Sequence, residues 1–167
     1  KHHAVRKVVF VGSPETGRRV ATTASAALKP SVLELGGKSA NIVFDDANLE
    51  HACLGAQAAI FSGAGQSCVA GSRLLVHKSI HAPLVEMLER GMNSIKLGDP
   101  LDEATEIGPI SNARQYAHVT GMIAAARDAG ADVLARSDTQ AQGYFVAPAV
   151  LNGLTKPAPH PQDAQLG

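Results

Sequence analysis

The chain alternates short β-branched runs with longer stretches that begin at helix-capping residues, and this alternation restricts the fold more than any other feature. Residues 7–11 form a continuous β-branched run beside Gly12, which is typical of a buried strand in a parallel sheet. Ser13 follows at an N-cap position, Pro14 takes the first helical position, and the alanine-rich stretch that begins here ends before Pro30. The sequence therefore opens with a predicted strand, a tight turn and a helix that reaches residue 28.

The same pattern repeats along the rest of the chain. Further strands are predicted at residues 31–35, 41–44, 73–76, 131–134 and 144–150, further helices at 46–62, 80–95 and 111–129, and a surface loop from 152 to 167. The predicted N-caps of these helices are Asp46, Ser79 and Ser111. Strands that alternate with helices predict an α/β fold with a parallel sheet covered on both faces.

Charge and hydropathy exclude several classes of partner. Fifteen basic and fifteen acidic side chains cancel, and no basic stretch is interleaved with aromatics, so we expect no nucleic acid or membrane partner. No apolar run approaches the roughly 20 residues that span a bilayer, and the first residues lack a signal peptide's apolar segment. We therefore expect a soluble, cytoplasmic protein. The chain starts without Met and stops at Gly167 without a helix cap, so we expect it to be an excerpt of a longer polypeptide.

The two cysteines, Cys53 and Cys68, are too few for a disulfide scaffold, so reduced thiols are expected. Cys53 lies on the apolar side of a predicted helix, as a small buried hydrophobic residue would. His77 and His81 are four positions apart, but a strand end separates them and no third ligand follows at a recognisable spacing. We expect no native metal site.

Cys68 occupies a different setting, a glycine-rich turn over residues 63–73 with the sequence Gly-Ala-Gly-Gln-Ser-Cys-Val-Ala-Gly-Ser-Arg. A thiol becomes a strong nucleophile as the thiolate, which needs access and groups that favour negative charge. Glycines keep side chains away and let backbone N–H groups approach the sulfur or a developing oxyanion. Cys68 is therefore a candidate nucleophile, with a small buried hydrophobic residue as the alternative.

Glu34 is a candidate general base. It lies in the apolar stretch of residues 32–35, and a carboxylate there could take a proton from water. The alternatives are an ion pair and a solvent-facing strand position, which spacing alone favours.

A possible phosphate site lies where the first strand passes into the first helix. Gly12 and Ser13 are followed after three residues by Gly17, which places free N–H groups and the positive end of a helix dipole near any bound phosphate. The alternative is that Ser13 only caps the helix.

Three segments, residues 9–17, 33–38 (Leu-Glu-Leu-Gly-Gly-Lys) and 63–73, closely resemble the aldehyde dehydrogenase superfamily, and the resemblance extends from about residue 8 to 151. It implies an incomplete α/β fold, a three-layer αβα sandwich around a parallel sheet. Residues 1–30 would be the last strand and helix of the dinucleotide-binding domain, and residues 31–167 would be part of the catalytic domain.

The resemblance also implies a reaction, the oxidation of a small-molecule aldehyde by NAD or NADP. Cys68 would add to the aldehyde, its backbone N–H would help to hold the oxyanion, and Glu34 would activate the water that hydrolyses the resulting thioester. The cofactor would lie near Gly12, Ser13 and Gly17 through its pyrophosphate and near Leu35 and Gly36 through its nicotinamide. A homodimer or homotetramer is implied.

Two other functions stay open at this point. Members of the superfamily carry an upstream asparagine of the oxyanion hole and a downstream glutamate segment that this sequence lacks, so we expect little activity from residues 1–167 alone. A truncated paralogue that acts by association, through the helix over residues 15–28, is one alternative. A cysteine thioesterase or hydrolase is the other, although no nearby spacing offers Cys68 a histidine. Aliphatic, aromatic and semialdehyde substrates are equally compatible with the sequence.

Overall fold

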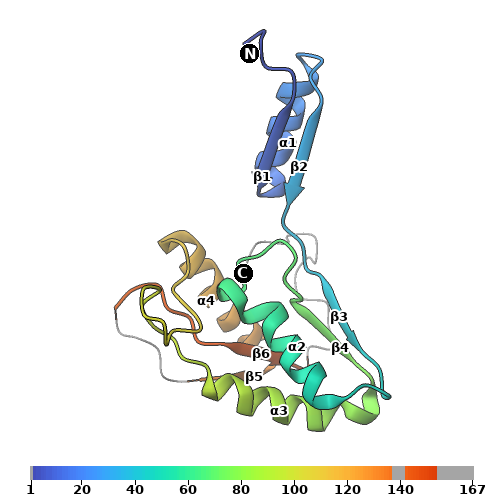
Figure 1. Ribbon diagram of the computed structural model, residues 1–167, viewed down its shortest axis with the longest axis vertical. Coiled ribbons are helices and arrows are strands. Elements are labelled where there is room, and N and C mark those ends of the chain that lie inside the picture. Colours follow the sequence, from blue (N-terminus) through green and yellow to red (C-terminus); the bar gives the residue numbers. More distant parts are fainter. Residues whose placement is uncertain (1, 137–141, 154–167) are drawn as a thin grey trace.

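The computed structural model of the protein describes residues 2–136 and 142–153. Within these residues the helices and strands form three small layered units that follow one another along the chain (Figure 1). No helix in the described ranges is long and apolar enough to cross a membrane. Most of the surface loop predicted for residues 152–167 lies outside the described residues.

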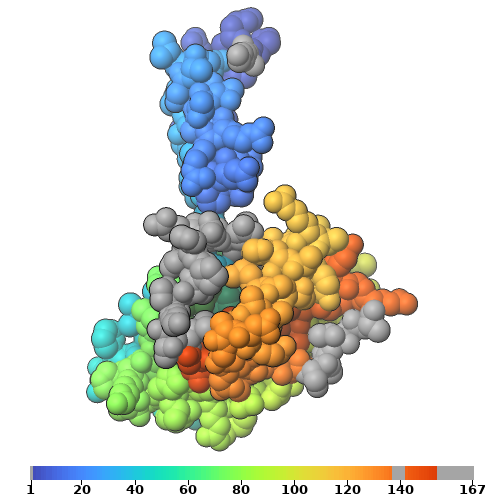
Figure 2. Space-filling model, turned by 180° about the vertical axis from the view of Figure 1, so that it is seen from behind, coloured from blue at the N-terminus to red at the C-terminus, as the bar shows by residue number. Residues whose placement is uncertain are grey.

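The first unit joins strand β1 (Val8–Gly12), helix α1 (Pro14–Ser25) and strand β2 (Ser31–Leu35). The two strands are parallel, with Val8 opposite Ser31 and Gly12 opposite Leu35. As predicted, Ser13 caps α1, and its Oγ accepts a hydrogen bond from the Thr16 N–H. Figures 1 and 2 show this unit projecting from the rest of the molecule.

Two expectations for this unit are corrected. Burial alternates along β1, and Val9 and Val11 are 65% and 70% exposed, because α1 covers only one face of the strand pair. The sequence predicted that this strand is buried on both faces, but in the structure only one face of β1 is covered. Helix α1 ends at Ser25, three residues earlier than predicted, and Leu28 takes a positive φ of 51° beyond it.

The second unit contains strands β3 (Ala40–Val43) and β4 (Arg73–Val76), helices α2 (Leu49–Phe61) and α3 (His81–Ser94), and the short 3-10 helices η1 (Ser62–Gly65) and η2 (Lys78–Ile80). The strands are again parallel, with Ala40 opposite Arg73. One face of the pair packs on α2 and α3 around a buried cluster: Val43, Cys53, Ala56, Leu84 and Leu88. Removing a leucine of this kind from water contributes about 1.5–3 kcal/mol, so this cluster holds α2 in place.

The third unit contains helix α4 (Ala113–Asp128) and strands β5 (Asp132–Ala135) and β6 (Ala149–Asn152). Here the strands are antiparallel, with Asp132 opposite Asn152, so this pair differs from the expected parallel sheet. The last strand begins at residue 149, so only the last two residues of the predicted strand over 144–150 lie in β6.

The α/β class predicted from the sequence is confirmed, and each sheet within the described residues has two strands. The predicted division between residues 30 and 31 falls just before β2, which pairs with β1 over its whole length. In the structure, therefore, the strand after residue 30 lies with the first unit. The assignment of residues 1–30 and 31–167 to two functional domains stays a prediction.

Candidate active site

The turn that carries Cys68 begins with a left-handed stretch of backbone. After α2 ends at Phe61, Gly63, Ala64 and Gly65 all have positive φ, at 61°, 56° and 74°. Glycine adopts such angles freely, whereas Ala64 carries a Cβ and is strained there. This stretch reverses the chain directly ahead of the cysteine.

Backbone hydrogen bonds then fold the turn back onto α2. The N–H of Gly71 donates to the carbonyl oxygen of Ala59 at 3.0 Å, and the N–H of Ala70 donates to that of Ser67 at 3.2 Å. Ala70 is buried, whereas Cys68 is exposed and forms no disulfide. The thiol therefore stands on a hydrogen-bonded turn and is open to solvent.

A second segment, residues 36–39, borders this turn. The Nε of Arg73 donates to the Lys38 carbonyl at 2.8 Å, and the N–H of Arg73 donates to the Ser39 carbonyl at 3.1 Å. A Cβ placed on Gly37 would lie 3.7 Å from the carbonyl oxygen of Cys68. The segment that follows Glu34 in the sequence thus packs against the turn that carries Cys68.

The side chain of Lys38 in this segment is partly withdrawn from water. Desolvation by burial lowers the pKa of Lys38 from its ordinary value. The border of the turn therefore holds an ammonium group in a less polar setting than a surface lysine has.

Glu34 itself lies on the open face of β2. Burial alternates along this strand, Glu34 and Val32 are on the exposed side, and Glu34 stands opposite Val11 of β1. Of the predicted alternatives, the solvent-facing strand position describes it. No hydrogen bond joins Glu34 to Cys68 within the part of the chain that the structure describes, so its role as a base stays a prediction.

The five candidate cofactor residues gather at one edge of the first unit. Gly12 and Leu35 are opposite each other at the carboxyl ends of β1 and β2, Ser13 starts α1, and Gly36 follows β2. Gly17 is buried, and a Cβ there would lie 2.7 Å from a methyl carbon of Leu35, so its lack of a side chain lets α1 approach β2 closely.

This edge fits a dinucleotide. Open α/β sheets bind ligands outside the carboxyl ends of parallel strands, and the N-terminus of a helix offers N–H groups to a phosphate. The Thr16 N–H donates to the Ser13 hydroxyl at 3.3 Å and the Gly17 N–H donates to the Ser13 carbonyl at 2.9 Å, so a phosphate would use the other backbone N–H groups at this edge. Glu15, the acidic residue of the first turn, is exposed and can turn its carboxylate to solvent.

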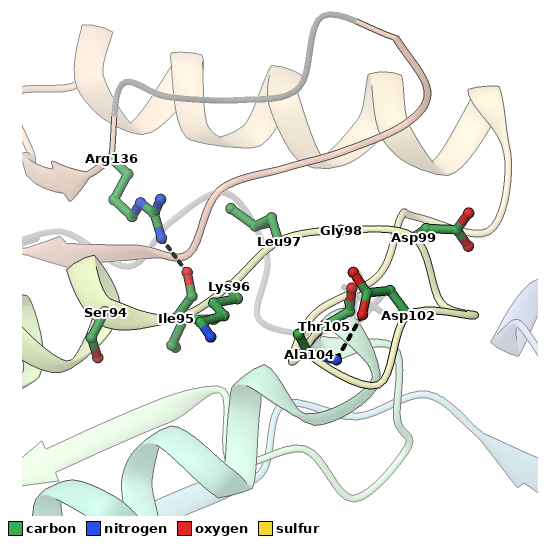
Figure 3. Close-up of a pocket in the computed structure, with 10 residues that line it drawn as sticks. All are labelled: Ser94, Ile95, Lys96, Leu97, Gly98, Asp99, Asp102, Ala104, Thr105 and Arg136. Carbon is green, nitrogen blue, oxygen red and sulfur yellow. Dashed lines mark hydrogen bonds between the residues drawn. The ribbon is translucent and has the colours of Figure 1, made fainter.

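Two hollows lie apart from these residues. One, of about 480 Å³, is lined by residues 94–99, 102, 104, 105 and 136 (Figure 3). At its border the guanidinium of Arg136 donates to the Ile95 carbonyl, and a carboxylate oxygen of Asp102 accepts from the Ala104 N–H at 2.9 Å. The other, of about 550 Å³, lies between β3 and the first turns of α2. Neither contains a predicted site residue, and the described residues hold no group of three side chains suited to a metal ion.

Sequence reasoning passed over two residues that connect distant parts of the site. Arg73 binds the carbonyl of Lys38 across 35 positions, and Gln66 accepts from the N–H of Ser111 across 45 positions. Both lie in the segment that identified Cys68. Arg73 and Gln66 lie too far from their partners in the sequence for the periodicity of a helix or strand to link them. The sequence therefore offered no signal for either contact.

Comparison with known proteins places these features in a family. The profile of the aldehyde dehydrogenase family matches residues 1–163. Betaine aldehyde dehydrogenase 1 from Oryza sativa subsp. japonica is 40% identical over 157 residues, which cover 92% of this chain and 31% of that protein. The chain therefore spans under a third of the length of this relative.

Solved structures agree with this comparison. PnpE from Pseudomonas sp. WBC-3 is 45% identical with a TM-score of 0.85, over 90% of this chain and 32% of that one. PnpE has also been solved in complex with nicotinamide adenine dinucleotide. The NAD-dependent aldehyde dehydrogenase from Sinorhizobium meliloti is 35% identical with a TM-score of 0.88, over 93% and 31% of the two chains. These likenesses confirm the predicted type of fold and its incompleteness.

Proposed function

The chain belongs to the aldehyde dehydrogenase family, and we propose that the complete polypeptide carrying it oxidises an aldehyde to a carboxylic acid, with Cys68 as nucleophile and NAD or NADP as oxidant. The observation that carries the proposal is the position of Cys68. It is exposed on a turn fixed by left-handed backbone and bordered by the segment that follows Glu34.

The first step is addition of the thiolate to the aldehyde. The Cys68 sulfur forms a bond to the carbonyl carbon, and the carbonyl oxygen gains the negative charge of the resulting thiohemiacetal. The backbone N–H of Cys68 donates to no other group within residues 2–136 and 142–153, so it is available to that oxygen. A hydrogen bond to the developing charge lowers the barrier to addition.

The edge formed by Gly12, Ser13, Gly17, Leu35 and Gly36 would hold the dinucleotide. A bound dinucleotide would supply the hydride acceptor, and loss of the hydride from the substrate carbon would turn the thiohemiacetal on Cys68 into a thioester. The close packing of Gly17 on Leu35 would keep α1 and the end of β2 in one fixed arrangement toward it.

Glu34 completes the cycle by acting on water. Its carboxylate takes a proton, the oxygen of the water adds to the thioester carbon, and the carbon–sulfur bond breaks to return the thiolate and release the acid. Support comes from the position of residues 36–39, which begin two positions after Glu34 and lie against the Cys68 turn.

The proposal applies to the complete polypeptide. Because the chain covers 31% of its relative betaine aldehyde dehydrogenase 1, we propose that residues 1–167 alone do not oxidise aldehydes. We also propose a homodimer or homotetramer, as the family resemblance implies, and a cytoplasmic location, as the hydropathy of the sequence led us to expect.

The test is aldehyde-dependent reduction of NAD or NADP by the complete polypeptide and by Cys68→Ser. We expect the substitution to lower kcat/KM by about 10³-fold or more, because a hydroxyl is a far weaker nucleophile than a thiolate. Cys53→Ser is the matched control. Cys53 lies in α2 and is buried in the apolar cluster, so its substitution should affect stability alone. Equal activity of Cys68→Ser and the unsubstituted protein would refute the proposal.

A further inference from the structure

The side chain of Gln66 connects the Cys68 turn to a distant part of the chain. Its Oε1 accepts from the N–H of Ser111 at 2.9 Å, and its Nε2 donates to the carbonyl of Gly63 at 3.3 Å. The N–H of Gln66 donates to the same Gly63 carbonyl at 3.2 Å. One residue thus binds the start of the left-handed stretch and the segment ahead of α4.

The stretch that Gln66 holds is strained. Ala64 has φ 56° and ψ 34°, a conformation that a residue with a Cβ adopts only when its surroundings enforce it. The Gly63 carbonyl, which receives both bonds from Gln66, immediately precedes Ala64. Gln66 is therefore placed to keep this turn in the left-handed form.

The other end of the connection is firmly anchored. Ser111 follows Ile110, which is 4% exposed and whose N–H donates to the Tyr144 carbonyl at 2.8 Å. Ser111 also precedes Asn112, the residue that caps α4. A bond to the Ser111 N–H thus ties the Cys68 turn to the residue that follows the buried Ile110.

We propose that Gln66 is the positioning residue for Cys68: its amide fixes the left-handed turn against the segment before α4 and so sets the direction of the thiol and the N–H of Cys68. The inference rests on the proposed function, in which Cys68 is the nucleophile. A glutamine fits because its amide offers an acceptor to Ser111 and a donor to Gly63 at the same time.

The first test is Gln66→Glu in the complete polypeptide. A carboxylate keeps the acceptor for Ser111 but faces the Gly63 carbonyl with a second acceptor, so the turn loses one bond and gains a repulsion. We expect kcat for aldehyde oxidation to fall at least about tenfold while KM changes less than about threefold, because the substrate still binds but meets a displaced nucleophile. A kcat within twofold of the unsubstituted value would overturn the proposal.

The second readout does not depend on dehydrogenase activity. The rate at which iodoacetamide alkylates Cys68, followed by peptide mass spectrometry, should change at least about fivefold in Gln66→Glu. Gln57→Glu is the matched control, since Gln57 is a half-buried glutamine of α2 that bonds Cys53 and lies outside the turn. The proposal fails if Cys68 is alkylated at an unchanged rate in Gln66→Glu, or if Gln57→Glu alters that rate equally.

A third variant separates positioning from general destabilisation. Ala64→Gly removes the Cβ that makes the left-handed stretch costly, so the turn depends less on Gln66. In the Gln66→Glu background, Ala64→Gly should recover several-fold of the lost kcat, and a destabilised protein without a positioning defect would show no recovery. Should Gln66→Glu not fold, Gln66→Met, which adds no charge, gives the same comparison.

The two proposals fail in different ways. The proposed function is refuted if Cys68→Ser keeps full activity. The positioning role alone is refuted if Cys68→Ser is inactive but Gln66→Glu leaves both kcat and the rate of Cys68 alkylation unchanged.

Discussion

At the scale of single residues, the two cysteines show how position decides chemistry. Cys53 is 4% exposed in the cluster beneath α2, and its Sγ accepts from the Nε2 of Gln57 at 3.2 Å. Cys68 is exposed on a backbone turn whose glycines leave room around it. A buried thiol is closed to small molecules, whereas an exposed one beside a free N–H group is open to them. The structure therefore supports a nucleophile at one position and a core residue at the other.

Residue patterns in the sequence predicted part of this site. The cap at Ser13 and the burial of Cys53 follow from local spacing and are confirmed. The bonds of Gln66 and Arg73 could not be predicted, because each joins segments that only the folded chain brings together. Long-range contacts of this kind carry no sequence period.

A prediction at this scale concerns Glu34. In the complete polypeptide, Glu34→Gln removes the proposed base but leaves Cys68 and the cofactor edge intact, so the first turnover should proceed and the second should stall. We expect a burst of reduced cofactor close to one equivalent per active site and a steady-state rate lower by about 10²-fold or more. Stopped-flow absorbance of the reduced cofactor measures both.

The matched control for Glu34 is Glu50→Gln, which neutralises an exposed carboxylate in the first turn of α2. It should leave both the burst and the steady state unchanged. A steady-state rate of Glu34→Gln equal to that of the unsubstituted protein would remove Glu34 from the mechanism.

At the scale of elements, helix starts were predicted within three residues. The predicted capping residue is confirmed for α1 alone, because Asp46, Ser79 and Ser111 do not cap α2, α3 and α4, and no side chain caps α3. Helix α2 is capped by Asn48 and α4 by Asn112, where the sequence favoured Asp46 and Ser111. Asn, Asp and Ser all cap helices well, so neighbouring candidates compete and local geometry chooses between them. The antiparallel pair β5 and β6 was not predicted, because strand direction depends on long-range pairing.

The contact between α1 and β2 gives a prediction at this scale. Gly17→Ala would place a Cβ 2.7 Å from a methyl carbon of Leu35, so Leu35 must move from the proposed nicotinamide edge. The better helix propensity of alanine offsets part of the clash, and we expect a net loss of about 1 kcal/mol in the free energy of unfolding. Thermal unfolding and NAD titration of the complete polypeptide should show lower stability and a several-fold higher Kd.

Gly55→Ala is the control for this change, because it is also a helical glycine and a Cβ there meets nothing within 4 Å. It should stabilise the protein by about 0.5–1 kcal/mol and leave the Kd for NAD unchanged. An equal Kd for NAD in Gly17→Ala and the unsubstituted protein would contradict the proposed role of this edge.

At the scale of the whole molecule, the described residues form three two-stranded units, and several strand faces remain open. Val9 and Val11 of β1 and Ile42 of β3 are more than half exposed. The α/β class followed from the alternation of patterns in the sequence. The pairing of β2 with β1 did not, because the residues of one strand do not determine which other strand it pairs with.

A reaction that passes through an acyl group on Cys68 leaves that group on the enzyme when its hydrolysis is blocked. The Glu34→Gln form of the complete polypeptide is mixed with aldehyde and NAD, quenched with acid and digested, and its peptides are examined by mass spectrometry. We predict that the added mass of the acyl group appears on the peptide that contains Cys68 and on no other peptide. It should be absent from the double variant that carries both Glu34→Gln and Cys68→Ser. An acyl group on the Cys53 peptide, or acid formed at the full rate without any acyl peptide, would contradict the claim.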